Sequence, residues 1–129
     1  MIVRPAQQDD LPHILAILEQ SEMRADDVDY SRWDGVLLVA VRQSEVIGFL
    51  HAMPGRPYSV ITHIAVVPAH RGGRAVSKLM ESVELLLRAS GYGNWFTHLY
   101  EKGETLREAT RHWGAYESPD PGYLYKRIL

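Results

Sequence analysis

The feature that most constrains this chain is a strand pattern that passes through a short turn into a long amphipathic helix. Residues 58–67 are rich in β-branched side chains and end at Pro68, which predicts a central, buried strand. A glycine-containing turn over residues 69–74 follows, and Gly91 stands where a helix C-terminus prefers glycine. Between them, apolar residues recur with the spacing of one buried helix face: Val76, Leu79, Met80, Val83, Leu86 and Leu87.

The other segments alternate strand and helix patterns around this unit. Residues 36–42 and 46–53 are apolar runs separated by a polar turn, which predicts a hairpin. The order predicts an α/β (α+β) fold with a single mixed, mostly antiparallel central sheet flanked by helices, and it excludes a doubly wound, all-parallel nucleotide-binding fold. The remaining expected elements are strands at 1–4, 94–100 and 123–129, a helix at 104–113, and a short helix within 22–33.

The first helix has a start signal and one apolar face. Asp9 and Asp10 precede Leu11 and Pro12, so an aspartate can cap the first amides while proline occupies the first turn. Apolar residues then follow at helical spacing, and we expect the buried face to consist of Leu11, Ile14, Leu15 and Leu18.

Length and composition fit one domain, which we expect to span residues 1–129. The absence of cysteine excludes disulfides, thiolate metal sites and cysteine nucleophiles. A net charge of -2 argues against a nucleic-acid partner. No apolar run approaches the ~20 residues of a spanning helix, and the first residues do not resemble an export leader. We therefore expect a cytoplasmic protein without a membrane partner.

The turn before the second long helix has the chemistry of an anion site. Free amides at a helix start carry partial positive charge, and glycines let the backbone approach an anion closely. Gly72 and Gly73 supply the glycines, while Arg71 and Arg74 add positive charge, so a pyrophosphate is a suitable ligand. An ordinary tight strand–helix connection explains the same spacing, and the segment matches neither a P-loop nor the three-glycine dinucleotide pattern.

Residues 61–80 as a whole carry a more specific pattern. Val66-Val67-Pro68 ends the strand, Arg71 lies in the turn, and Leu79-Met80 follows in the helix. This resembles the acetyl-coenzyme A motif of the GNAT superfamily of N-acetyltransferases, in which a Val-x-Pro strand end leads through Arg/Gln-x-x-Gly-x-Gly/Ala into an amphipathic helix. Three other segments are similar to the family in the same order, namely residues 3–12, 39–49 and 113–116.

The resemblance implies a GNAT (acyl-CoA N-acyltransferase) fold and an enzyme that transfers an acetyl group from acetyl-CoA to a primary amine. The amine would attack directly in a ternary complex, and the acceptor would be a small molecule or a protein or peptide amine. In the family, two strands corresponding to residues 61–67 and 94–100 splay apart around the pantetheine arm. Family members often dimerise, so a homodimer is an expected assembly.

The same resemblance implies which residues bind acetyl-CoA. The pantetheine arm would pair with backbone groups of one strand, and the pyrophosphate would lie on amides of the turn and the helix start. The implied strand residues are Ile64, Ala65 and Val66, and the implied turn and helix residues are Arg71, Gly72, Gly73, Arg74, Ala75 and Val76.

The usual acid and base of the family do not carry over. Branches that acetylate protein N-termini place a glutamate and a tyrosine where this chain has Thr97 and Thr110. Arg74 and Val76 also replace the two later small residues of the turn motif in a gapless register. These departures motivate an alternative function, a catalytically impaired GNAT-fold protein that acts as an acyl-CoA-binding, protein-interaction or regulatory module. Amine-dependent thiol release would distinguish the enzyme from that module.

Local candidates for the acid and base remain. His63 and His98 lie on the two strands expected to splay, and imidazole titrates near neutral pH, so each is a candidate base. Tyr100, with Tyr116 as a weaker competitor, is a candidate acid for the leaving thiolate. A packing role explains each of these residues as well. Strand alternation turns His63 away from the face of Thr62 unless a bulge intervenes.

Two further features bear on ligands. The 6 histidines are scattered without a His-x-x-x-His pair or a carboxylate cluster, so we expect no metal. The acidic stretch at residues 22–29 lies where acceptor-binding helices of the family usually sit, and it would attract a cationic amine. A solvated loop is the alternative interpretation of that stretch.

Overall fold

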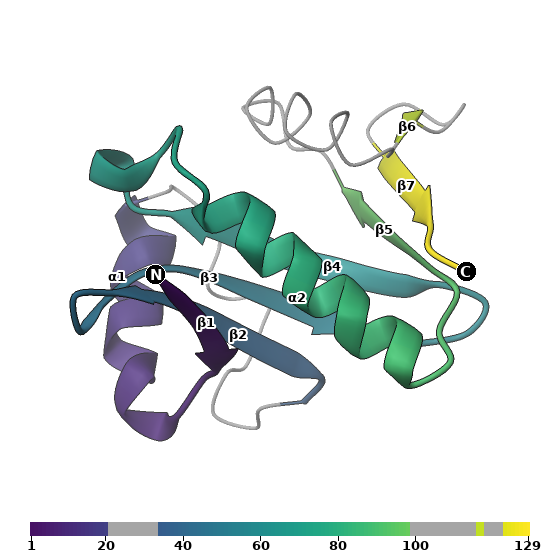
Figure 1. Cartoon of the computed structure of the whole chain (residues 1–129), viewed down its shortest axis with the longest axis horizontal. Coiled ribbons are helices and arrows are strands. Elements are labelled where there is room, and N and C mark those ends of the chain that lie inside the picture. Colours follow the sequence, from purple (N-terminus) through teal and green to yellow (C-terminus); the bar gives the residue numbers. More distant parts are fainter. Residues whose placement is uncertain (21–33, 99–115, 118–122) are drawn as a thin grey trace.

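The computed structural model describes residues 1–20, 34–98, 116–117 and 123–129. Within them, seven strands form one mixed sheet in the order β1-β2-β3-β4-β5-β7-β6 (Figure 1). Every neighbouring pair is antiparallel except β4 and β5, which are parallel, so the predicted mixed sheet is confirmed. The strands are β1 (Ile2–Pro5), β2 (Val36–Arg42), β3 (Glu45–Met53), β4 (Ser59–Val66), β5 (Asn94–His98), β6 (Tyr116–Glu117) and β7 (Tyr123–Arg127).

Two α-helices cover opposite faces of this sheet (Figure 1). Helix α2 (Ala75–Ala89) packs on one face and forms the larger apolar cluster, whose buried members include Leu79 and Trp95. Helix α1 (Leu11–Gln20) packs on the other face against a smaller cluster around Phe49. In the part of the chain that the structure describes, no helix is long and apolar enough to cross a membrane.

The buried faces of both helices differ in part from the predictions. In α1, Leu15 is 43% exposed and Ile17 is buried in its place. Each helical residue turns the chain by about 100°, so a face centred between Ile14 and Leu18 leaves Leu15 at its margin. In α2, Leu86 is 43% exposed, and the buried position is taken by the charged residue Glu84.

The hairpin of β2 and β3 turns more tightly than predicted. Gln43 and Ser44 have φ angles of 50° and 65°, so two residues complete the turn and β3 begins at Glu45. The predicted helix cap is confirmed, because Gly91 has a φ of 82° and its amide donates to the Arg88 carbonyl at 3.0 Å. The predicted helical segments at 22–33 and 104–113 lie outside the described residues.

An ion pair fastens β1 to the start of α1. Arg4 donates two hydrogen bonds to the Asp10 carboxylate, at 2.7 and 3.1 Å, and the Gln7 amide donates a third at 2.7 Å. Asp10 therefore caps the short 3-10 helix η1 (Gln8–Asp10) that precedes α1. The hydrogen bond from Arg4 lowers the pKa of Asp10, and the same bond raises the pKa of Arg4.

Replacement of this carboxylate should cost stability at neutral pH but not in acid. Because the folded pKa lies below the unfolded value of about 3.9, the contribution is present above that value and is lost as the pH falls toward the folded pKa. We expect Asp10→Asn to lower the free energy of unfolding by about 1–3 kcal/mol at pH 7, and by much less at pH 3. Urea unfolding at the two pH values measures the free energy of unfolding. Asp9→Asn is the control, because Asp9 is the exposed neighbour of Asp10.

Candidate functional site

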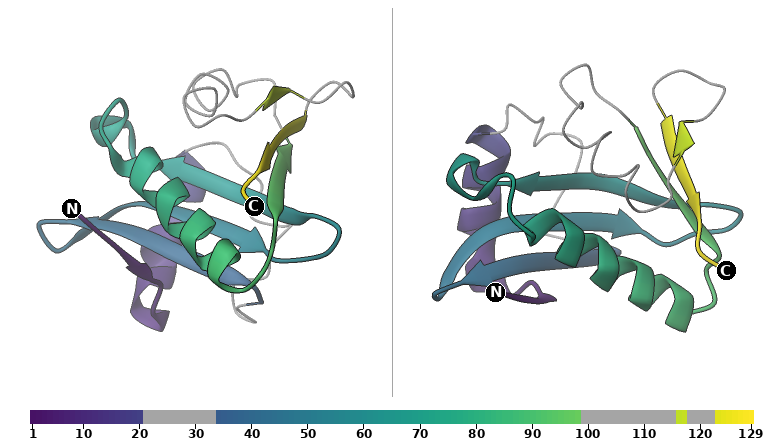
Figure 2. Two further views of the ribbon diagram at one scale, coloured as in Figure 1. Left: turned by 45° about the vertical axis from the view of Figure 1, so that its right-hand side comes forward. Right: turned by 45° about the horizontal axis from the view of Figure 1, so that its top comes forward.

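The site is built around the only parallel strand pair that the described residues contain. β4 and β5 are paired at three positions, which are Ser59 with Trp95, Val60 with Phe96 and Ile61 with Thr97. Beyond Ile61 and Thr97 the two strands diverge, and β5 leans away from β4 together with β7 (Figure 2). We call this divergence the β4–β5 fork. The splayed strands expected from the sequence are therefore present.

A threonine closes the base of the fork. Thr97 is buried, and its hydroxyl donates to the Ile61 carbonyl at 2.9 Å. Thr97 stands at the position of the family glutamate. Its side chain forms a structural hydrogen bond between the two strands. Thr97 cannot serve as a general base, because a hydroxyl remains protonated at neutral pH.

The edge of β4 that faces the fork carries the backbone groups of Ile64 and Val66. The Val67 amide donates to the Ile47 carbonyl of β3 at 2.8 Å, and hydrogen-bonded positions alternate along an antiparallel pair. Ala65 is therefore the next position bonded to β3, whereas Ile64 and Val66 direct their amides and carbonyls toward the fork. Two of the three expected strand contacts face the fork, and Ala65 faces β3.

The turn between β4 and α2 begins as a short 3-10 helix, η3 (Pro68–His70), and continues through exposed residues 71–74. Gly72 has a φ of +85°, a conformation that L side chains rarely adopt. The Arg71 guanidinium donates from Nε to the Val66 carbonyl at 3.0 Å. This bond fixes a cation beside the edge of β4 that faces the fork.

The amides of the turn and helix start divide into two groups. Those of Arg71 and Gly73 donate to carbonyls within the turn, at 3.3 and 3.4 Å. The first hydrogen bond of α2 runs from the Lys78 amide to the Arg74 carbonyl at 3.0 Å, and Arg74 provides no side-chain cap. The amides that precede this bond point out of the helix end and are available to an anion: Ala75, Val76 and Ser77.

His63 lies just beyond the base of the fork and is buried, with 6% of its surface exposed. The pairing of β3 with β4 shifts so that Thr62 is an extra residue, a β-bulge. Because of the bulge, Ile61 and Ile64 both join the cluster under α2, and His63 shares the opposite face with Ala65, on the side of α1.

The bulge also brings together three polar side chains. His63 lies opposite His51 of β3. The Thr62 hydroxyl lies 2.5 Å from His51 Nδ1 and 3.3 Å from His63 Nδ1, and His51 Nε2 lies 2.7 Å from the Asp34 carbonyl oxygen. His51 was not among the residues expected from the sequence. The only signal for it was its place in the hairpin, which becomes informative once the register is known.

The other candidate catalytic residues are placed only in part. His98 is the last residue of β5 and pairs with Tyr123 of β7. Tyr100 lies outside the described residues, and Tyr116 belongs to β6. Of the candidate bases, His63 is therefore the one whose surroundings the structure describes.

The sequence matches the acetyltransferase (GNAT) family over residues 3–117. The chain belongs to the GNAT family. As a GNAT protein it is an acetyl-CoA-dependent N-acetyltransferase. No curated protein matches the chain.

Solved structures show the same fold at low sequence identity. Ard1 from Thermoplasma volcanium has a TM-score of 0.86 at 16% identity and covers 99% of this chain and 97% of its own. A ribosomal-protein-alanine N-acetyltransferase from Brucella melitensis has a TM-score of 0.80 at 20% identity, covering 98% and 99%. The PaiA N-acetyltransferase from Thermoplasma acidophilum, solved with coenzyme A, has a TM-score of 0.82 at 13% identity, covering 98% of each chain.

A buried ion pair holds α2 against the outer strands of this GNAT protein. Lys126 of β7 contacts the Glu84 carboxylate of α2 at 2.7 Å, and their side chains are 17% and 7% exposed. The Trp95 indole of β5 donates to the other carboxylate oxygen at 3.4 Å. α2, whose first turn faces the fork, is thereby tied to the two strands that diverge from β4.

An open hollow of about 630 Å³ lies beside η3, and none of the residues expected to hold the coenzyme lines it. Its lining comes from the end of α1, the start of β3 and η3, namely Gln20, Glu45, Val46, Ile47, Val67, Pro68, Ala69 and His70. Across the described ranges, no three histidine, aspartate or glutamate side chains gather in a way that could hold a metal ion.

Proposed function

We propose that this protein transfers the acetyl group of acetyl-CoA to a primary amine by direct attack in a ternary complex. The fork carries the proposal, because it combines an open strand edge, a helix N-terminus and a fixed arginine within one strand–turn–helix unit. The alternative, a GNAT-fold module without turnover, is not favoured by the family match.

Each part of the acetyl-CoA molecule has a suitable group in this unit. The edge of β4 offers the Ile64 backbone and the Val66 amide to the amide-bearing pantetheine arm, while the Val66 carbonyl accepts from Arg71. The amides at the start of α2 offer donors to the pyrophosphate, with the dipole of the helix adding positive potential. Arg71 supplies a full positive charge at the same end.

The chemistry requires one bond to form and one to break. An acceptor ammonium with a pKa near ~10 must first lose a proton to become a nucleophile. Its nitrogen lone pair then attacks the thioester carbonyl carbon, a C–N bond forms, and the C–S bond breaks. The attacking nitrogen loses a second proton, and the departing thiolate is protonated. We assign the first proton to His63, beside the fork, as general base.

Calorimetric titration with acetyl-CoA, followed by thiol release in the presence of amines, tests this function. The amine set contains a polyamine, an aminoglycoside, a lysine-containing peptide and a peptide that begins with alanine. We expect micromolar binding and release that depends on one of these amines. Binding without any amine-dependent release would support an acyl-CoA-binding module instead. No binding up to millimolar concentration would exclude the enzyme and leave only a module that acts through protein partners.

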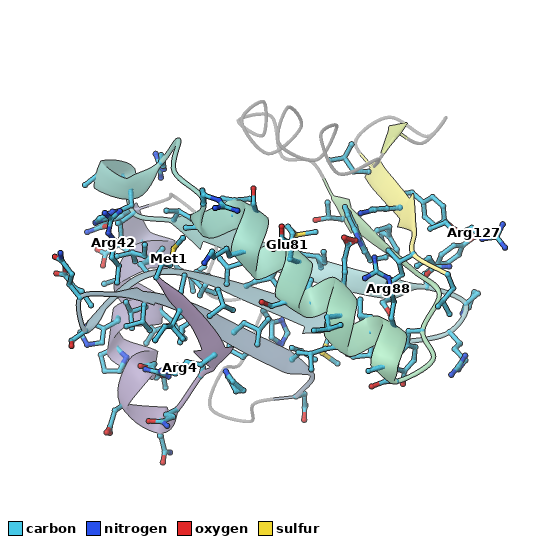
Figure 3. All side chains as sticks on the ribbon, viewed as in Figure 1. Met1, Arg4, Arg42, Glu81, Arg88 and Arg127 are labelled. Atoms are coloured by element: carbon cyan, nitrogen blue, oxygen red, sulfur yellow. The ribbon has the colours of Figure 1, made fainter. Side chains whose placement is uncertain are left out.

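Charge reversal in the turn tests the placement of the pyrophosphate. We expect Arg71→Glu to weaken acetyl-CoA binding by about 10- to 100-fold. The reason is that the hydrogen bond between the Arg71 guanidinium and the pyrophosphate, a charged bond of about 1.5–3 kcal/mol, is lost. Arg127→Glu is the matched control. Arg127 is also exposed and also donates from Nε to a main-chain oxygen, that of Leu129 at 3.2 Å, but it lies at the end of β7 and points away from the sheet (Figure 3). Equal affinities of the two variants would contradict the placement.

A further inference from the structure

A side chain of the turn after β4 lies on the strand edge that the pantetheine arm is proposed to use. Ile64 and Val66 direct their amides and carbonyls toward the β4–β5 fork. Of these groups, the Val66 carbonyl accepts a hydrogen bond from Arg71 Nε at 3.0 Å. The Arg71 side chain and an extended ligand would therefore meet at the same carbonyl.

The local backbone explains why Arg71 reaches back to this strand. Pro68 begins the 3-10 helix η3, and the Arg71 amide donates to the Pro68 carbonyl at 3.3 Å, which turns the chain back toward the end of β4. Arg71 itself has extended backbone angles, with φ of -69° and ψ of 144°. The residue is exposed, so its guanidinium can exchange the carbonyl for another acceptor without opening the core.

The guanidinium and a pantetheine arm compete for the Val66 carbonyl. The arm carries amide N–H groups, which pair with the carbonyls of a strand edge as a neighbouring strand would. If Arg71 stayed on Val66, an arm amide would be buried in the fork without an acceptor. A buried donor without a partner costs free energy, so binding of the arm alone is weakened.

The start of α2 offers the guanidinium a stronger acceptor once a coenzyme is bound. The amides of Ala75, Val76 and Ser77 point out of the helix end and attract an anion. A pyrophosphate held there lies at the same end of the strand–turn–helix unit as Arg71. Hydrogen bonds between two ionised groups are roughly twice as strong as neutral ones, so the guanidinium favours phosphate over the carbonyl.

We propose that Arg71 selects the acetyl donor, because it leaves the Val66 carbonyl only for a thioester that carries the pyrophosphate. This inference rests on the proposed function, since it concerns the donor of that reaction. Thioesters of pantetheine without the pyrophosphate meet an occupied carbonyl. A coenzyme A thioester moves the guanidinium to its phosphates, and the carbonyl then accepts from the arm.

Calorimetric titration of the full-length protein with two donors tests the selection. Acetyl-CoA carries the pyrophosphate, and S-acetyl-pantetheine ends in a hydroxyl at that position. Arg71→Met keeps an apolar stem and cannot donate. We expect it to bind acetyl-CoA about 10- to 100-fold more weakly and S-acetyl-pantetheine about 2- to 10-fold more tightly than the wild type.

The opposite signs distinguish selection from a structural role. A damaged turn would weaken both donors, and a carbonyl that accepts from both groups at once would leave the affinity for S-acetyl-pantetheine unchanged. Either result overturns the proposal. Arg127→Met is the matched control, because Arg127 is exposed and also donates from Nε to a main-chain oxygen, at 3.2 Å. It should bind both donors like the wild type.

The sequence also allows the Val66 carbonyl to be observed directly. Val66-Val67 is the only pair of consecutive valines in the chain. In protein labelled with ¹³C-carbonyl and ¹⁵N-valine, the Val67 amide is therefore the one signal coupled to a labelled carbonyl. We expect Arg71→Met to shift this carbonyl signal in the free protein, and Arg127→Met to leave it in place. An unchanged signal in Arg71→Met would overturn the proposal.

These readouts separate donor selection from the function on which it rests, because they measure binding and not turnover. If the wild type binds acetyl-CoA but acetylates no amine, the proposed function fails, and opposite changes in the two affinities still support the selection. If the wild type turns over and Arg71→Met weakens both donors alike, the proposed function stands and the selection is overturned.

Discussion

Lys126→Met should lower the free energy of unfolding by about 3–5 kcal/mol, since removal of one partner leaves a charge buried without its counter-ion. The remaining partner is the Glu84 carboxylate, 7% exposed, whose other contact is the Trp95 indole at 3.4 Å. Methionine preserves the apolar stem of lysine, so the effect reports the lost charge rather than a cavity. Urea unfolding at neutral pH measures it.

A double variant that also removes the Glu84 charge provides the control for this result. In Glu84→Gln/Lys126→Met no charge is buried, and the glutamine oxygen still accepts from Trp95, so most of the lost stability should return. Glu81 projects from the same helix one turn earlier and is exposed (Figure 3), so Glu81→Gln should change stability by less than about 0.5 kcal/mol. A double variant as unstable as Lys126→Met would show that the ion pair is not the cause.

This ion pair also shows where pattern reasoning from the sequence stops. Periodicity placed α2 and most of its buried face, because the spacing of apolar residues is a local property. It counted Leu86 as buried and passed over Glu84, whose burial depends on a lysine 42 positions later in the chain. Burial of a charged side chain costs free energy unless an oppositely charged partner lies beside it, and here that partner comes from another element.

The fork and the bulge show the same limit, because part of each depends on strand register and not on a local sequence pattern. Both strands of the fork were predicted from the sequence, β4 from its β-branched run, and their divergence was implied by the resemblance to the GNAT family. That pairing stops after Ile61 and Thr97, and that Thr97 closes the base, follows from a register between segments 36 residues apart. The bulge at Thr62 likewise has no local signature, yet it decides which face His63 occupies.

His63→Asn should reduce kcat for the best amine acceptor by about 10²–10⁴, the contribution of a general base. The asparagine side chain can still form a hydrogen bond with the Thr62 hydroxyl, which lies 3.3 Å from His63 Nδ1, so the packing at the bulge is kept. Asparagine has no group that accepts a proton at neutral pH, so only the chemical step should suffer. Steady-state kinetics, with calorimetry of acetyl-CoA binding, separates the expected fall in kcat from any change in affinity.

The same substitution at an exposed histidine is the control, because it makes the same chemical change away from the proposed site. His13→Asn on α1 changes the same atoms at the surface, and we expect its kcat to stay within a factor of about two of the wild type, as for most surface substitutions. If His63→Asn also turned over like the wild type, His63 would be a packing residue of β4, and the proton of the amine would leave by another route. If instead its acetyl-CoA affinity fell while kcat held, the residue would act through the shape of the fork. Loss of kcat alone, at unchanged affinity, is the result that makes His63 the base.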